Sequence, residues 1–256
     1  MMLARLIEIA KRAGAALAAV QAEDLGARYK SRGQLVTRAD EVSHALIEAQ
    51  LAQAFPDVPR VMEEQANEAR LPAGAYLVVD ELDGTIPFSR GMREWAVMIA
   101  RIDGRPTHGV IYLPAWETLI AAEAGRGCTL NGEKIRLSSS RSLADAVLGM
   151  ELNLYLGAEH RERFVSRLSA VALSTRCLAC AGAAVAELLL GRTDLYLNCR
   201  GGKIWDFAAG ALAVEEAGGV AWRIDGTPIA WNSLEMDVLL AANPHIAEQA
   251  LTIAAG

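Results

Sequence analysis

The sequence has little cysteine, few aromatic residues and no long apolar run, and each scarcity excludes a class of protein. Four cysteines in 256 residues are too few for a disulfide-stapled secreted scaffold. No apolar run reaches the ~20 residues that a membrane-spanning helix needs, so no membrane partner is expected. Basic residues are also outnumbered, because Lys and Arg total 25 against 31 Asp and Glu. The resulting net charge of −6 disfavours a nucleic-acid polymer as a partner.

The composition that remains is typical of a globular protein. Hydrophobic residues make up 52% of the chain and charged residues 22%. A chain of 256 residues is long enough for one large domain or two closely packed lobes.

The alanine-rich N-terminus resembles a targeting segment, but charged residues argue against one. Glu8, Lys11 and Arg12 interrupt it, and its apolar residues fall at helical spacing. The pattern predicts an amphipathic helix of the mature protein over about Leu3–Ala22.

The cysteines give no evidence for a metal or redox site. Cys177 and Cys180 form a C-L-A-C pair, but no second pair or histidine cluster completes a zinc site. We therefore expect Cys128, Cys177, Cys180 and Cys199 to be small buried thiols, because the surroundings of the CxxC pair are typical of a tightly packed helix. That usage favours a reducing cytoplasm as the location.

The two halves of the chain differ in their pattern. The first predicts two helices and then a largely antiparallel sheet, and the second alternates helices with short strands. Expected helices are Leu3–Ala22, Arg38–Leu51, His160–Ala170, Ala181–Leu190 and Phe207–Ala217. Expected strands are Tyr76–Val79, Glu94–Ile102, Pro106–Leu113, Thr118–Glu123, Ala146–Glu151, Asp194–Leu197, Val220–Arg223 and Val238–Ala242, with a hairpin turn at Asn131-Gly132. We expect an α+β lobe over residues 1–140 and an α/β lobe over 141–256, with a soft boundary near Ser138–Arg141 and one continuous core.

Three acids follow the strand-like run Y-L-V-V that begins at Tyr76. A D-G turn explains one acid, but Asp80, Glu81 and Asp83 together repel one another unless a cation neutralises them. Thr85 is a suitable N-cap for a helix that begins there. The N–H groups of Gly84 and Thr85 at such a helix start favour phosphate, and carboxylates beside a phosphate require Mg²⁺.

Two further acidic segments are candidates for the same centre. Glu63 and Glu64 follow an apolar pair, and Asp206 precedes a helix of small residues. Each also has a simpler interpretation, namely a solvated pair and a helix cap. Charged residues expected to face solvent are Glu81, Glu215 and Glu216.

Several segments resemble the inositol monophosphatase family of Mg²⁺-dependent phosphatases, within the lithium-sensitive superfamily. D-E-L-D-G-T is similar to its D-P-x-D-G-T signature, and W-D-F-A-A-G to W-D-x-A-A-G. V-M-E-E and Q-L-V-T-R-A-D match its glutamate pair and its D-x-V-T-x-x-D segment. G-V-I-Y-L-P, G-R-G-C-T-L-N-G and V-E-E-A-G-G extend the likeness over nearly the whole chain.

The resemblance implies a fold, a reaction and residue roles. The implied fold is an α/β sandwich of alternating layers, α-β-α-β-α. The implied partners are a phosphorylated small molecule and a second copy of the chain in a homodimer. Glu63, Asp80 and the Leu82 carbonyl are implied to hold one Mg²⁺, and Asp80, Asp83 and Asp206 a second, with a third cation and Li⁺ inhibition also implied. Asp40 and Thr85, with Glu63 nearby and Thr37 supporting Asp40, orient a metal-activated water in this scheme. Gly84 and Thr85 bind phosphate, and the implied substrate contacts are Asp83, Ala181, Asn198 and Asp206.

The departures from the family pattern concern the substrate. Glu81 replaces the usual proline, Ile86-Pro87 replaces T-N, and Gln34 replaces a common Asp. Asn198 stands where inositol-specific members carry a Glu. Arg200 and Lys203 are then either surface charges or contacts for a second phosphate or carboxylate. The alternatives to inositol phosphate are a 3′(2′),5′-bisphosphate nucleotide, histidinol phosphate, fructose bisphosphate or another sugar phosphate, and a non-catalytic regulatory protein of this fold.

Overall fold

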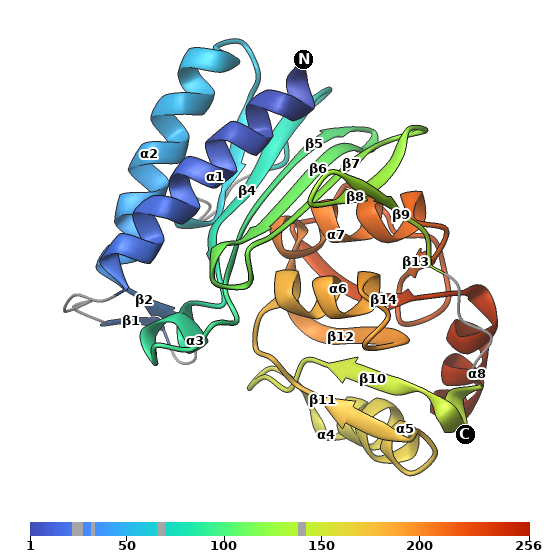
Figure 1. The fold of residues 1–256 in the computed structure, drawn as a ribbon. Coiled ribbons are helices and arrows are strands. Elements are labelled where there is room, and N and C mark those ends of the chain that lie inside the picture. The colour runs from blue at the N-terminus through green and yellow to red at the C-terminus, as the bar shows by residue number, and fades with distance from the viewer. Residues whose placement is uncertain (22–27, 32–33, 66–69, 138–141) are drawn as a thin grey trace.

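The computed structural model describes residues 1–256 apart from 22–27, 32–33, 66–69 and 138–141. Helices and sheets alternate in five layers (Figure 1). The expected α-β-α-β-α architecture is therefore confirmed. The predicted boundary at 138–141 lies outside the described residues.

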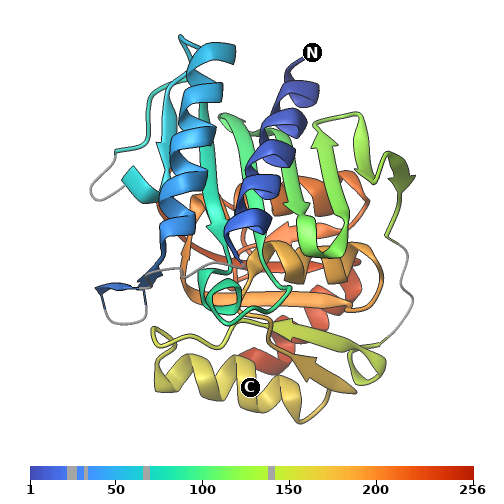
Figure 2. The ribbon, with the colours of Figure 1, turned by 60° about the vertical axis from the view of Figure 1, so that its left-hand side comes forward.

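The first outer layer consists of α1 (Met2–Val20) and α2 (Arg38–Ala54), which lie side by side on one face of the larger sheet (Figure 2). The helical spacing of Leu6, Ile9, Ala13 and Leu17 places these residues on the buried side of α1. The N-terminal segment is therefore an amphipathic helix of the folded domain, as predicted.

The larger sheet has seven strands in the order in which they occur along the chain. They are β3 (Arg60–Met62), β4 (Tyr76–Asp83), β5 (Ala96–Asp103), β6 (Arg105–Leu113), β7 (Thr118–Glu123), β8 (Gly127–Leu130) and β9 (Glu133–Ile135). Only β3 and β4 pair in parallel, so the sheet is largely antiparallel. Asn131 and Gly132, both with positive φ, form the predicted turn between β8 and β9. A separate ribbon pairs β1 (Arg28–Ser31) with β2 (Gln34–Val36).

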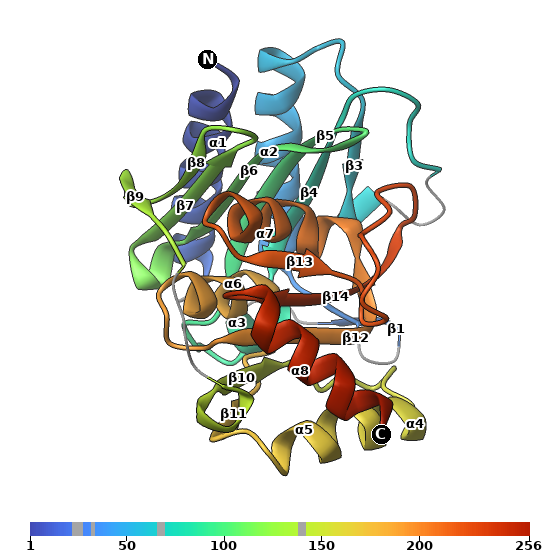
Figure 3. The same cartoon turned by 90° about the vertical axis from the view of Figure 1, so that its right-hand side faces the viewer.

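The second sheet has five strands and mixed pairing. Its order is β11 (Ser174–Arg176), β10 (Val147–Met150), β12 (Leu195–Lys203), β14 (Glu235–Ala241) and β13 (Val220–Trp222). Its outer face is covered by α8 (Pro244–Ala255) and by the helical run of α4 (Ala158–His160), η4 (Arg161–Ser166) and α5 (Arg167–Ser169), as Figure 3 shows. The C-terminal helix α8 and strand β3 were not predicted.

Two helices fill the space between the sheets, α6 (Ala181–Leu189) and α7 (Ile204–Glu216). The small residues of α7 allow close approach to the larger sheet, since a Cβ added at Gly109 would lie 2.9 Å from the Ala209 Cα. The largest hydrophobic cluster takes side chains from both sheets and both helices, from Val61 to Ala242. One core thus connects the two halves of the chain.

The C-L-A-C pair precedes helix α6, and the expected start of that helix is confirmed. Helix α6 begins only at Ala181, with Cys180 as its N-cap. Cys177 is exposed, whereas Cys128, Cys180 and Cys199 are buried free thiols as expected.

Candidate active site

An irregularity in strand β4 brings two of the predicted acids to one face of the sheet. Asp80 pairs with Met98 of β5, and Asp83 pairs with Ala96, so β4 carries one extra residue between the two pairs. Residues three apart in a regular strand point to opposite faces, but the extra residue restores Asp80 and Asp83 to the same face. The expected strand Tyr76–Val79 therefore extends through the acids to Asp83, and all eight residues are buried.

Asp40 is joined to the end of β4 through Thr85. The Thr85 hydroxyl lies 3.2 Å from the Asp40 Oδ1 and 3.1 Å from the Leu82 carbonyl oxygen, so it can donate to either. The amide and hydroxyl of Thr37 donate to the Asp40 Oδ2 at 2.6 and 2.7 Å. These donors form a capping box at the start of α2 and fix the Asp40 side chain, which is 3% exposed.

Gly84 makes the turn that follows the strand. Its φ of +83° and the 2.5 Å between an added Cβ and the Glu94 carbonyl oxygen both require glycine. Gly84 is the N-cap of the short helix α3 (Thr85–Ser89), so the prediction that Thr85 is the cap was wrong. Thr85 is instead the first helical residue, and its side chain turns back towards Asp40 and Leu82.

Asp83 connects β4 to the start of α6. The amides of Ala181 and Gly182 donate to its two oxygens at 3.1 and 2.6 Å, and the Cys180 thiol donates at 3.0 Å. Ala181, a predicted substrate contact, thus uses its amide to hold Asp83 and also lines the cavity described below.

Asp206 makes a capping contact at the start of α7, which is the simpler of the two interpretations that the sequence left open. It lies in the first turn of α7, and its Oδ2 accepts a hydrogen bond from the Lys203 amide at 2.8 Å. It also lines the same cavity as Asp80 and Asp83. A capping contact therefore fixes a side chain that faces the candidate site.

The acids of the site disfavour one another's charge. Burial, followed by the charge of Glu63, raises the pKa of Asp80 well above its usual value. Burial and the neighbouring Asp206 do the same to the pKa of Glu63. Burial and Asp83 raise the pKa of Asp206 to about 7. Such a set is stable as carboxylates only when a cation neutralises it.

These groups line a cavity of about 430 Å³ between the two halves of the chain. Of the predicted residues, Glu63, Asp80, Leu82, Asp83, Gly84, Thr85, Ala181, Asn198 and Asp206 line it. Thr37 and Asp40 do not line it, but hydrogen bonds connect them to Thr85, which does. Asn198 is buried on β12 and accepts a hydrogen bond from the Arg200 amide at 3.1 Å.

The cavity also contains residues that sequence reasoning missed. Glu151 follows β10, and burial together with Asp83 raises its pKa to about 7. The signal was available, since Glu151 ends an apolar strand as Asp80 does. Tyr196 and Trp205 carried no such signal, because their side chains read as ordinary core.

Glu81 does not face solvent, so that prediction was wrong. Its side chain is buried, and its Oε1 lies 2.6 Å from the His44 Nδ1. Glu216 is also engaged, since its oxygens accept hydrogen bonds from the amides of Gly125 and Gly127 at 2.7 and 2.8 Å. Glu215 is exposed, as expected.

The two cations before Asp206 lie at the edge of the site. Lys203 lines the cavity, and its Nζ forms an ion pair with Glu235. Arg200 is exposed and lines the neighbouring cavity instead, beside Arg163 and Arg223.

Comparison with known proteins extends these observations over the whole chain. Residues 2–255 match the sequence model of the inositol monophosphatase family. Inositol monophosphatase 2 of Solanum lycopersicum is 32% identical over 248 residues, which cover 94% of this chain and 92% of the relative. Within the described residues, no helix is both long and apolar enough to cross a membrane.

Solved structures share the fold. The extragenic suppressor protein suhB of Bartonella henselae superposes with a TM-score of 0.90 at 27% identity, covering 99% of this chain and 98% of that one. An IMPase/NADP phosphatase complexed with Mg²⁺ and phosphate has a TM-score of 0.80 at 22% identity, covering 90% of this chain and 86% of its own. The likeness to this second structure concerns the fold alone.

Proposed function

Because the chain belongs to the inositol monophosphatase family, we propose that it hydrolyses a phosphate monoester of a small metabolite with the help of Mg²⁺. The observation that carries the proposal is the extra residue in β4, which gathers Asp80 and Asp83 beside the Gly84–Thr85 turn. Asp40 approaches the same turn from the opposite side through Thr85. The proposed reaction class is therefore hydrolysis at phosphorus rather than at carbon.

The donor set fits magnesium. Carboxylate and carbonyl oxygens are hard ligands, and the site offers them from Glu63, Asp80, Asp83, Asp206 and the Leu82 carbonyl. Asp80, Leu82 and Asp83 are buried, and the raised pKa values of Glu63, Asp80 and Asp206 indicate an excess of negative charge that divalent cations neutralise. We assign Glu63, Asp80 and Leu82 to one Mg²⁺ and Asp80, Asp83 and Asp206 to a second. Bound magnesium supplies charge neutralisation and Lewis acidity towards the phosphate and the attacking water.

The chain's own residues then orient the reactants. The Thr85 hydroxyl donates to Asp40 and presents its oxygen lone pair to a water in front of the phosphate. The Thr37 donors hold the Asp40 carboxylate in this orientation, although its burial raises its pKa to about 6. The amides of Gly84 and Thr85 at the start of α3 are the phosphate donors in this proposal.

Asn198 favours a substrate group that accepts a hydrogen bond over a substrate group that needs an anionic partner. Asn198 is buried, and one of its oxygen lone pairs is engaged by the Arg200 amide. Its amide group can donate to a substrate oxygen, which a Glu cannot do. Glu151 lines the same cavity and offers a carboxylate near the substrate space.

The test is phosphate release with Mg²⁺ or EDTA from inositol 1-phosphate, fructose 1,6-bisphosphate, 3′-phosphoadenosine 5′-phosphate, histidinol phosphate and AMP. We expect metal-dependent release from at least one compound, which also identifies the substrate class. Asp206→Asn should lower kcat by at least about a hundredfold, because it removes a negative charge from the second metal site. Asp225→Asn, in the neighbouring cavity, is the matched control and should retain activity.

Two results would contradict the proposal. Unchanged turnover in Asp206→Asn would refute the two-metal assignment. Absence of hydrolysis together with absence of Mg²⁺ binding would favour a non-catalytic role, such as the one suggested by the suppressor name of the Bartonella protein.

A further inference from the structure

Glu81 occupies a position where the family signature has proline, and it brings a fifth carboxylate to the site, beside Glu63, Asp80, Asp83 and Asp206. A carboxylate oxygen of Glu81 lies within 4.8 Å of one oxygen each from Glu63 and Asp80. Glu81 is 1% exposed, so water does not screen its charge. A side chain with these properties is expected to have a cation as a neighbour.

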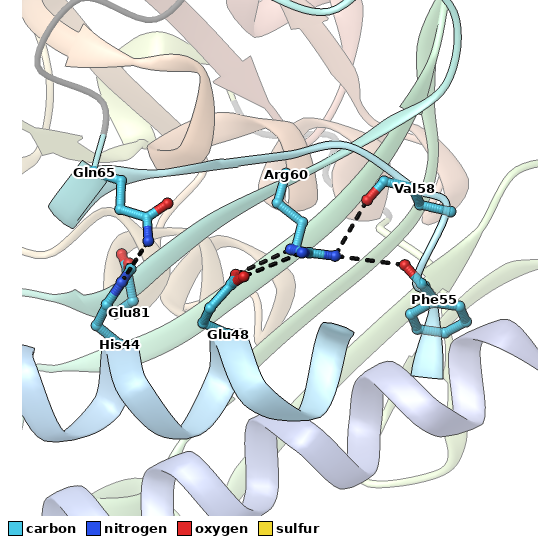
Figure 4. A network of polar contacts seen from close by, with 7 residues as sticks. All are labelled: His44, Glu48, Phe55, Val58, Arg60, Gln65 and Glu81. Atoms are coloured by element: carbon cyan, nitrogen blue, oxygen red, sulfur yellow. Dashed lines mark hydrogen bonds and ion pairs between the residues drawn. The ribbon is translucent and has the colours of Figure 1, made fainter. Parts of the chain in front are cut away.

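One oxygen of this carboxylate has a hydrogen-bond partner, His44. The His44 Nδ1 lies 2.6 Å from the Glu81 Oε1, and the His44 Nε2 lies 2.9 Å from the Gln65 Nε2 (Figure 4). An amide nitrogen donates, so the His44 Nε2 accepts and the Nδ1 carries the proton. His44 therefore donates to the Glu81 Oε1 and orients the carboxylate. Gln65 belongs to the same short helix, η1 (Glu63–Gln65), as Glu63.

The other oxygen has no such partner. The Glu81 Oε2 is buried and accepts no hydrogen bond from any residue that the structure describes. An orphaned buried carboxylate oxygen is costly, and native proteins rarely retain one without a ligand. The Ser43 hydroxyl donates to the Glu81 carbonyl oxygen at 2.7 Å and fixes the backbone that carries this side chain.

We propose that Glu81 supplies an additional carboxylate oxygen for a divalent cation bound at Glu63 and Asp80, with His44 as its orienting partner. The site would take hard cations such as Mg²⁺ and Mn²⁺, which prefer oxygen ligands. Three carboxylates would bind the cation more tightly than two, because the buried third carboxylate adds electrostatic attraction that water does not screen. The inference rests on the metal centre of the proposed function, and it concerns affinity for the cation rather than turnover.

The test measures Mn²⁺ binding by the metal-free protein in the absence of substrate, with electron paramagnetic resonance reporting free Mn²⁺. Glu81→Gln keeps the shape and the His44 hydrogen bond but removes the charge, and we expect its tightest Kd to rise at least about tenfold. His44→Ala should weaken binding in the same direction, by about threefold to tenfold, since ligand orientation is lost. Glu48→Gln is the matched control, because Glu48 lies one turn further along α2 and pairs with Arg60 at 3.0 Å (Figure 4).

A tightest Kd for Glu81→Gln within twofold of the wild type, as in the Glu48→Gln control, would overturn the proposal. Circular dichroism verifies that each variant is folded, and Glu81→Pro, which restores the family residue, provides a second variant that should also bind Mn²⁺ more weakly.

The outcome is separable from the proposed function. Mn²⁺ binding that depends on Glu81, without hydrolysis of any phosphate ester, would support this site and refute the proposed phosphatase activity. Hydrolysis together with unchanged Mn²⁺ affinity in Glu81→Gln would support the phosphatase activity and refute the role of Glu81.

Discussion

The acidic cluster predicts that the metal-free protein loses stability as the pH rises. The pKa of the Asp206 carboxyl is about 7 in the folded chain against 3.8 ordinarily, because burial and Asp83 oppose its ionisation. A carboxyl with a raised folded-state pKa contributes stability that is fully present below pH 3.8 and is lost as the pH rises through about 7. The loss therefore accumulates between pH 3.8 and about 7 and levels off above that, so the expected direction is lower stability at the alkaline end.

The magnitude follows from the same shift. Between pH 6 and pH 8 the folded Asp206 passes from mostly protonated to mostly ionised, while the unfolded group is ionised throughout. At about 1.4 kcal/mol per pH unit, this single group costs about 1.4 kcal/mol over the interval, because its average protonation in the folded chain there is one half. For a chain of this size, that loss corresponds to a fall in Tm of about 3–6 °C. Saturating Mg²⁺ favours the ionised form and should abolish this part of the dependence.

The assay is a pair of thermal melts by circular dichroism, at pH 6 and pH 8 in EDTA, repeated with Mg²⁺. The Asp206→Asn variant isolates the contribution, because His44 also has a raised pKa and changes stability in the same direction. We expect a smaller fall in Tm between pH 6 and pH 8 in Asp206→Asn than in the wild type. An equal fall in the two proteins, or a metal-free wild type that is more stable at pH 8, would refute the reasoning.

Two further substitutions test the site from other directions. Asn198→Glu should raise kcat/KM towards inositol 1-phosphate by severalfold, because it restores an anionic acceptor for ring hydroxyls; unchanged kinetics would mean that Asn198 does not contact the substrate. Gly84→Ala should destabilise the protein by about 1–3 kcal/mol and reduce activity, because its φ is +83° and a Cβ would lie 2.5 Å from the Glu94 carbonyl oxygen. Urea unfolding measures the loss, with Gly91→Ala, where φ is also positive but no atom lies within 4 Å, as the control for the backbone term alone.

Regular elements with strong local signals could be predicted from the sequence alone. The amphipathic pattern of α1, the Asn131-Gly132 turn and the β-branched run of β4 each depend on neighbours in the chain, and each was found where expected. The ordered motifs around Asp80, Asp206, Glu63 and Asp40 likewise identified the family. Hydrophobic periodicity and turn chemistry are properties of short segments, so a single sequence carries them.

What the tertiary structure decided is the environment of individual polar side chains. Nothing local distinguishes Glu81, which is buried against His44 from a different helix, from Glu215, which is exposed. The extra residue in β4 appears only when β5 provides a register, and it places Asp80 and Asp83 on one face. Burial and charge at these positions come from residues far away in the sequence, such as Asp206, whose charge raises the pKa of Asp80. The sequence by itself determined the family and the candidate site residues. The fold decided which of those residues meet, because long-range packing sets the dielectric and the neighbours of every charge.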